Sequence, residues 1–145
     1  MATINPYLNF DGKTEEAFNF YKSLFGGEFL VFQRFSEVPG AGDMPQEEGK
    51  RIMHLSLPMG KHVVLMGSDT QCGGSQQEVL IGNNFFLSLN TDSEEETERL
   101  FKGLAEKGLV IMPLEKAFWG AYFGMIEDQF GIKWMLNYEI DKVVE

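Results

Sequence analysis

Residues 118–140, FWGAYFGMIEDQFGIKWMLNYEI, contain two strand-like stretches joined by a tight turn. The turn is Asp128-Gln129-Phe130-Gly131, with Asp where a type I turn favours a side-chain acceptor and Gly where the chain leaves the turn. The exit strand alternates with a period of two, which predicts a sheet with two different faces. One face carries Ile132, Trp134, Leu136 and Tyr138, and the other carries Lys133, Met135, Asn137 and Glu139.

A helix signal occurs in each half of the chain. In the first half, apolar residues at helical spacing follow Asp11 and Thr14, either of which can cap the helix, and Gly26-Gly27 ends it. In the second half, Ser93 and Glu96 form a capping box, and we expect that helix to stop at Gly108. A slide of eighty residues pairs similar positions of the two helices: Glu15 with Glu95, Glu16 with Glu96, Lys22 with Lys102 and Leu24 with Leu104.

Strand-like stretches surround both helices. They lie at 4–10, 28–35, 51–58 and 62–69 in the first half, and at 84–93, 109–115 and within 118–140 in the second half. The repeated order β-α-β-β-β predicts one domain, 1–145, built from two tandem modules. We place the first module at 1–69, a linker at 70–82 and the second module at 83–145.

The predicted fold class is therefore α+β. Each βαβββ module is expected to form a curved mixed sheet of four strands with its helix on the convex side, so that the concave sides line a cleft. A ligand would bind in that cleft. Residues 36–50, rich in Pro, Gly and acidic residues, are predicted to form an exposed loop, with a mobile lid as the alternative.

The composition excludes several classes of function. The chain has 145 residues and a formal net charge of −10, from 22 acidic and 12 basic side chains, which argues against nucleic-acid partners and anionic membrane surfaces. The first residues have no basic segment followed by an apolar run, and no stretch approaches the roughly 18 apolar residues of a membrane span. A single cysteine, Cys72, excludes an internal disulfide. We expect a cytoplasmic protein.

Three stretches carry a resemblance to a known family: PYLNFDGKTEEAFNFYKSLFGGE at the start, MHLSL with LMGSD in the middle, and FWGAYFGMIEDQFGIKW at the end. In these stretches the chain resembles the PhnB-like branch of the vicinal oxygen chelate superfamily, which includes glyoxalase I, extradiol dioxygenases and the bleomycin resistance proteins. The pattern Trp-Gly, Asp-x-Phe-Gly and Trp is typical of that branch. Some members are labelled 3-demethylubiquinone 3-methyltransferases, but this chain has no glycine-rich βαβ unit for an adenosyl cofactor.

The resemblance implies a divalent metal held by His, Glu or Gln on the first and last strand of each module. The corresponding positions here are within Asn5-Pro6-Tyr7, near Leu65 or Met66, near Phe86, and at Met135. None of the best-aligned side chains is a strong ligand for such an ion. We therefore expect no metal at these positions and no other cofactor.

His54 is the best candidate for a catalytic acid or base, and the resemblance places it at a recurrent His of the branch. The alternative is a half-buried histidine satisfied by a neighbouring group. The expected ligand-binding residues are Tyr7, His54, Phe86, Trp119 and Met135. Trp119 either walls the pocket or belongs to the core, and Trp134 is predicted to face the helix as core.

The other candidates have simpler interpretations. Asp69 and Asp128 are predicted to be acceptors in turns. His62 is expected to be exposed, and Glu127 is positioned to face the cleft. Cys72 has no adjacent basic group that would activate its thiol.

Two functions from different classes remain open. One is a metal-independent protein that binds a small molecule in an aromatic, methionine-rich cleft. The other is a lyase, isomerase or dioxygenase relative that uses a displaced metal or His54. The resemblance also implies a homodimer, and a purely structural dimer is a third possibility.

Overall fold

The computed structural model describes residues 2–40, 42, 44–70 and 78–140. The chain divides into two compact units, Met1–Leu80 and Ile81–Glu145. The division falls inside the range 70–82 that we assign as linker, but the linker itself stays a prediction because 71–77 lie outside the described residues. Cys72 lies outside them as well.

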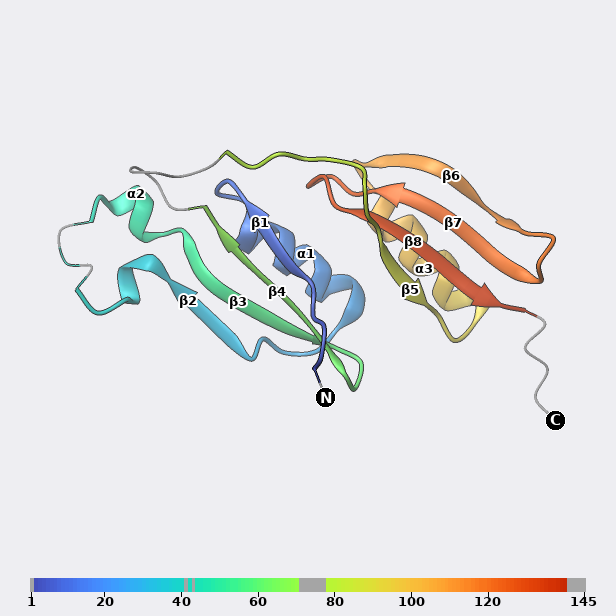
Figure 1. Cartoon of the computed structure of the whole chain (residues 1–145), viewed down its shortest axis with the longest axis horizontal. Coiled ribbons are helices and arrows are strands. Elements are labelled where there is room, and N and C mark those ends of the chain that lie inside the picture. The colour runs from blue at the N-terminus through green and yellow to red at the C-terminus, as the bar shows by residue number, and fades with distance from the viewer. Residues whose placement is uncertain (1, 41, 43, 71–77, 141–145) are drawn as a thin grey trace. The chain divides into compact units, whose positions relative to one another are not determined.

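Each unit contains a four-stranded mixed sheet and a helix that packs on it (Figure 1). The first unit has the strand order β1-β4-β3-β2, and the second has the order β5-β8-β7-β6. In both units the first and last strands pair in parallel, and the other pairs are antiparallel. The predicted α+β class and the duplicated βαβββ order are confirmed.

The elements of the first unit are β1 (Tyr7–Phe10), α1 (Thr14–Phe25), β2 (Val31–Arg34), the 3₁₀ turn η1 (Phe35–Glu37), α2 (Gln46–Gly49), β3 (Ile52–Met59) and β4 (Val63–Asp69). Those of the second are β5 (Leu87–Asn90), α3 (Glu94–Ala105), β6 (Leu109–Lys116), β7 (Ala121–Glu127) and β8 (Lys133–Glu139).

The core of each unit lies between the sheet and its helix. In the first unit Phe18 and Tyr21 of α1 are fully buried, and the Phe18 ring lies directly over Gly67 of β4, where a Cβ would come within 2.6 Å of it. In the second unit Trp134 is 1% exposed, which confirms its predicted place in the core. Gly124 of β7 makes the equivalent close approach, to Phe101 of α3.

Two buried aspartates hold the ends of these elements together. Asp69 accepts hydrogen bonds from the backbone N–H and the hydroxyl of Thr14 at 3.1 and 2.7 Å, and from the Ile52 N–H at 2.8 Å. The prediction of Asp11 or Thr14 as the helix cap was therefore wrong, because the acceptor comes from β4. The prediction of Asp69 as a turn acceptor was also wrong, because its partners are distant in sequence.

Asp128 is the turn acceptor that we predict. Its Oδ1 accepts from the N–H groups of Phe130 and Ile132, and the Gly131 N–H bonds to its carbonyl at 3.0 Å. Its Oδ2 also accepts from the Trp134 indole N–H at 2.9 Å. One carboxylate thus shapes the turn and anchors the largest core side chain.

Several boundaries differ from those that we predict. The predicted loop 36–50 contains α2 and the last two residues of η1. The four residues QEEG of α2 form a helical turn that local apolar periodicity cannot reveal. The strands expected at 4–10, 28–35 and 84–93 are shorter, because pairing covers only four residues of each. Helix α3 ends at Ala105 rather than at the predicted Gly108. The residue with a positive φ after the helix, 60°, is Lys107. Gly108 follows it because a Cβ there would lie 2.3 Å from the Glu127 carbonyl oxygen.

Replacement of either buried aspartate should destabilise its own unit. Asp69→Ala and Asp128→Ala each leave buried N–H groups without an acceptor, so we expect each to lower the free energy of unfolding by about 2–4 kcal/mol. Urea denaturation followed by circular dichroism measures the loss. Asp92→Ala, at an exposed position, is the matched control, and an Asp69→Ala protein as stable as that control would contradict the assignment.

Candidate functional site

The strand registers define a helix-free face on each sheet. In the first unit, Leu55, Leu57 and Leu65 face α1 and are buried. The alternate residues therefore point the other way. One cross-strand row on this face runs Tyr7, Met66, Ser56 and Val31, each paired with the next.

Tyr7 and His54 come together on the helix-free face of the first unit. The Tyr7 hydroxyl lies 3.4 Å from His54 Nδ1, and the two rings stack with centroids 5.7 Å apart. Tyr7 is 45% exposed and His54 is half-buried. The neighbour of His54 is therefore a tyrosine hydroxyl rather than a backbone group or a carboxylate. Both side chains remain accessible within this unit.

The helix-free face of the second unit carries a row of methionines. Met112 pairs with Met125, Met125 pairs with Met135, and Met135 pairs with Ser88. These four residues, here called the methionine row, cross all four strands in the order β6-β7-β8-β5. The alternate residues Ile126, Trp134 and Leu136 are buried toward α3. The row therefore presents thioethers and one hydroxyl.

Aromatic side chains lie beside the methionine row. Phe123, two residues before Met125, makes an edge contact with Trp119 at 5.8 Å between ring centroids. Trp119 also contacts Phe118 at 5.0 Å and is 57% exposed, so it is not a core residue within this unit. Phe86 directly precedes β5 and is half-buried.

An ion pair ends the helix-free face at the turn between β7 and β8. Glu127 pairs with Lys133 at 3.1 Å, and the Lys133 ammonium also donates to the Gly82 carbonyl at 2.6 Å. Glu127 is thus held in a structural contact. His62, which precedes β4, is exposed.

The side chains at the positions implied for a metal do not fit one. Tyr7 pairs with Met66 on the helix-free face of the first unit. In the second unit Met135 pairs with Ser88, while Phe86, the third implied position, directly precedes β5 and has no donor atom. The side chains of these two pairs are a phenol, a hydroxyl and two thioethers. They include no imidazole or carboxylate, the groups that hold divalent metal ions in such protein sites. Within the described ranges, no group of three or more His, Cys, Asp or Glu side chains is arranged to hold a metal.

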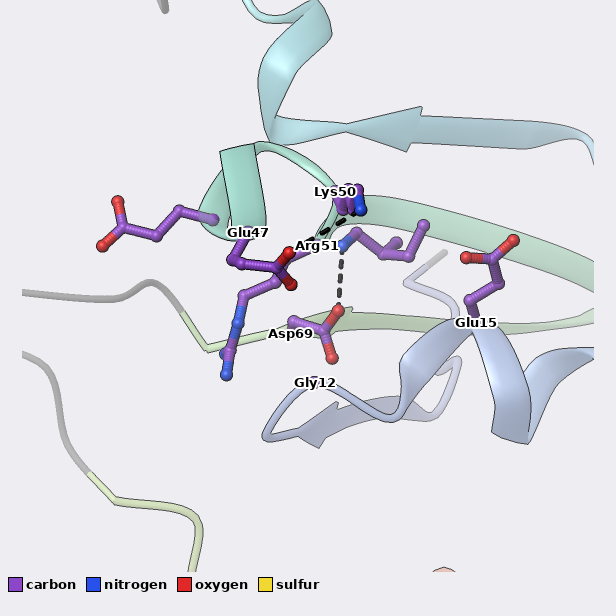
Figure 2. A pocket seen from close by; sticks show the side chains of 8 residues that line it. Gly12, Glu15, Glu47, Lys50, Arg51 and Asp69 are labelled. Atoms are coloured by element: carbon purple, nitrogen blue, oxygen red, sulfur yellow. Dashed lines mark hydrogen bonds and ion pairs between the residues drawn. The ribbon is translucent and has the colours of Figure 1, made fainter. Parts of the chain in front are cut away.

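A separate polar pocket of about 390 Å³ lies beside the N-terminus of α1 (Figure 2). Its wall is lined by Gly12, Glu15, Glu47, Glu48, Lys50, Arg51, Ile52 and Asp69. The Asp69 carboxylate already accepts hydrogen bonds from Thr14 and Ile52.

The charged side chains around this pocket bind to one another. Arg34 forms a bidentate pair with Glu15 at 2.9 Å, and this hydrogen bond raises the pKa of Arg34 above its ordinary value. Arg51 donates to Asp11 at 2.6 Å and to the Thr70 carbonyl at 2.8 Å. These contacts join Arg34 of β2 to α1, and they join Arg51, which follows α2, to the residues just before α1 and just after β4. We therefore interpret the pocket as a structural charge network.

The five predicted ligand-binding residues fall into two groups. Tyr7 and His54 lie together in the first unit, while Phe86, Trp119 and Met135 belong to the second. Sequence reasoning missed Met112 and Met125, although both lie on predicted strands. The cross-strand register, which places three methionines in one row, is the observation that identifies them.

The family model described as the Glyoxalase/Bleomycin resistance protein/Dioxygenase superfamily matches residues 3–136. The chain belongs to this superfamily. Its resemblance to the PhnB-like branch is supported by a Bacillus cereus structure titled a putative 3-demethylubiquinone-9 3-methyltransferase, PhnB protein. That structure is 28% identical, with a TM-score of 0.76, and covers 94% of this chain and 99% of its own.

Two further superfamily relatives are similar over nearly the whole chain. The crystal structure of PA1353 from Pseudomonas aeruginosa is 40% identical, with a TM-score of 0.81 and coverage of 96% of this chain and 98% of its own. Protein YjdN from Escherichia coli K12 is 29% identical over 142 residues, which cover 92% of this chain and 93% of that protein. Neither name states an activity.

In the part of the chain that the structure describes, the helices are too short or too polar to cross a membrane.

The two tryptophans should differ sharply in their access to solvent. Trp134→Phe leaves Trp119 as the single fluorophore, and Trp119→Phe leaves Trp134. We expect a larger acrylamide quenching constant for Trp134→Phe, because Trp119 is 57% exposed and Trp134 is 1% exposed. Far-UV circular dichroism checks that both variants fold. Equal quenching constants would show that Trp119 is covered in solution.

Proposed function

We propose that this superfamily member binds a small, predominantly apolar molecule on its helix-free sheet faces, without the divalent metal that the resemblance implies. The observation that carries the proposal is the methionine row. Three thioethers lie side by side in this row, and one of them, Met135, is at a position that the resemblance implies for a metal ligand. Aromatic rings of Trp119 and Phe123 lie next to them.

Methionine side chains suit such a role because they are flexible and polarisable. They adapt to ligands of different shape and make favourable contacts with aromatic rings. An apolar surface with a few polar groups at its edge is also the usual composition of a small-molecule site. Ser88 and the neighbouring asparagines Asn90 and Asn137 supply those polar groups.

A second candidate function rests on the Tyr7–His54 pair. An imidazole beside a phenol hydroxyl, both accessible on a sheet face, is suited to metal-independent proton transfer in a lyase or an isomerase. A displaced metal bound through His54 is the other form of this alternative. The separation of 3.4 Å between hydroxyl and ring nitrogen is long, so ligand binding would have to tighten it.

Methyl transfer is not part of the proposal. The Bacillus cereus relative carries that activity in its title. Both sheets here are mixed, with strand orders β1-β4-β3-β2 and β5-β8-β7-β6, rather than the parallel doubly wound sheet that binds nucleotide-like cofactors at a glycine-rich turn.

The homodimer that the resemblance implies stays a prediction, as does the cytoplasmic location. One feature supports a covered surface on the second unit: Leu109, Val110, Ile111 and Met112 of the edge strand β6 are all more than 40% exposed. Pro113 and two register shifts interrupt the same strand, which disfavours direct strand-to-strand pairing at this edge. A partner would therefore contact the side chains of β6.

Metal content separates the two candidate functions. Protein purified without chelator, then soaked in Zn²⁺, Mn²⁺, Fe²⁺ or Ni²⁺ and dialysed, should retain less than about 0.1 ion per chain by plasma mass spectrometry. Near-stoichiometric metal would contradict the proposal and favour the enzyme. A His54→Ala protein soaked in parallel would then show whether that histidine is a ligand.

The methionine row should bind an uncharged apolar probe. We expect N-phenyl-1-naphthylamine to gain fluorescence on binding and to shift the ¹³C-methyl resonances of Met112, Met125 and Met135. Met125→Gln and Met135→Gln should each weaken binding about threefold to tenfold, because each replaces an apolar contact with an amide.

Met59→Gln is the matched control, since Met59 is also a half-buried strand methionine but lies in the first unit. Shifts confined to methionines outside the row would show that the row is not the binding surface. Equal weakening by Met59→Gln would show the same.

A further inference from the structure

A second cross-strand row, next to Tyr7 in the first unit, consists entirely of uncharged polar residues. Asn9 pairs with Ser68, and His54 pairs with Gln33. Leu55 of β3 pairs with Gly67 of β4 in an antiparallel register. The next residues along the two strands, His54 and Ser68, therefore lie opposite each other. Asn9, Ser68, His54 and Gln33, here called the polar row, thus cross the strands in the order β1-β4-β3-β2 on the helix-free face.

The polar row is accessible and only loosely bonded within the protein. Asn9 is exposed, and Ser68, His54 and Gln33 are half-buried. The contacts of the row are long: Ser68 Oγ lies 3.4 Å from Asn9 Oδ1, and His54 Nδ1 lies 3.4 Å from the Tyr7 hydroxyl. Bonds of this length are weak, so a ligand can replace them at little cost.

The chemistry of the row selects the kind of ligand. Asn and Gln amides each offer donors and an acceptor, and Ser and His can do either. The row contains no carboxylate, ammonium or guanidinium. The nearest charged neighbour on β2, Arg34, is held by Glu15 of α1 at 2.9 Å. A charged ligand group would therefore lose its hydration without gaining an opposite charge.

We infer that the polar row binds the uncharged polar edge of a planar molecule, such as a carboxamide, with the ring of that molecule packed against Tyr7. Tyr7 supplies the stacking surface because the residue is 45% exposed and its ring plane lies within 29° of the His54 ring plane. The inference rests on the proposed function, since it names the ligand chemistry of a protein that we propose binds small molecules.

The second unit offers a matched surface with a different composition. The equivalent row there is Asn90, Asn137, Phe123 and Glu115, paired in that order. Phe123 replaces His54, and Glu115 introduces a carboxylate where the first unit has Gln33. Asn84, an exposed asparagine that precedes β5 and lies outside both rows, provides the control, so Asn84→Leu is compared with Asn9→Leu.

A pair of probes that differ only in charge tests the inference. Benzamide and benzoate are titrated separately into ¹⁵N-labelled full-length protein at about pH 8. We expect benzamide to shift the side-chain amide resonances of Asn9 and Gln33, with saturation. Benzoate should bind at least about tenfold more weakly.

Variants locate the binding surface. Asn9→Leu and Gln33→Leu should each weaken benzamide binding about threefold to tenfold, and Asn84→Leu should leave it unchanged. The spectra themselves confirm that each variant folds. Benzoate binding as tight as benzamide, shifts confined to the second unit, or no effect of Asn9→Leu and Gln33→Leu would each overturn the inference.

The N-phenyl-1-naphthylamine probe distinguishes a failure of the polar-row inference from a failure of the proposed function. Binding of that probe to the methionine row together with no benzamide shift at the polar row would overturn only the inference. No shift by the naphthylamine at the methionine row would overturn the proposed function, whatever benzamide does.

Discussion

The Asp69 carboxylate accepts three hydrogen bonds from two segments that are far from it in sequence, the start of α1 and the start of β3. Because the side chain is 5% exposed, the loss of water around it must be offset by these bonds. They join the end of β4 to the helix that covers the sheet. The first unit depends on this contact, because the buried donors of Thr14 and Ile52 would otherwise lack an acceptor.

In the second unit, the corresponding buried aspartate bonds to residues that are close to it in sequence. Asp128 bonds to the N–H groups of Phe130 and Ile132 in its own turn and to the indole of Trp134 on the next strand. Helix α3 has its own cap, because Ser93 accepts from the Glu96 N–H and Glu96 accepts from the Asp92 N–H. Duplicated modules have therefore kept the topology while the contacts that stabilise it have diverged.

The open faces of the two modules have diverged as well. At equivalent register positions, Ser56 in the first unit corresponds to Met125 in the second, and His54 corresponds to Phe123. The first face offers hydrogen bonds and a tyrosine ring, and the second offers thioethers and aromatic rings. At the positions that the resemblance implies for a metal, neither face provides a set of imidazole and carboxylate donors.

Much of the fold was predictable from the sequence by itself. Period-two alternation around Trp134, the capping box at Ser93 and the repeated order of elements are local patterns, and each predicts its element without knowledge of the rest. They also predict that Trp134 faces the core while Met135 faces away. Tertiary structure decided which residues meet. The pairing of β1 with β4 and of β5 with β8 joins strands about sixty and fifty residues apart, and no local pattern sets a register over that distance. The β1–β4 pairing brings Tyr7 to His54 and carries Asp69 to Thr14, and the registers of β6 with β7 and of β7 with β8 align the methionines.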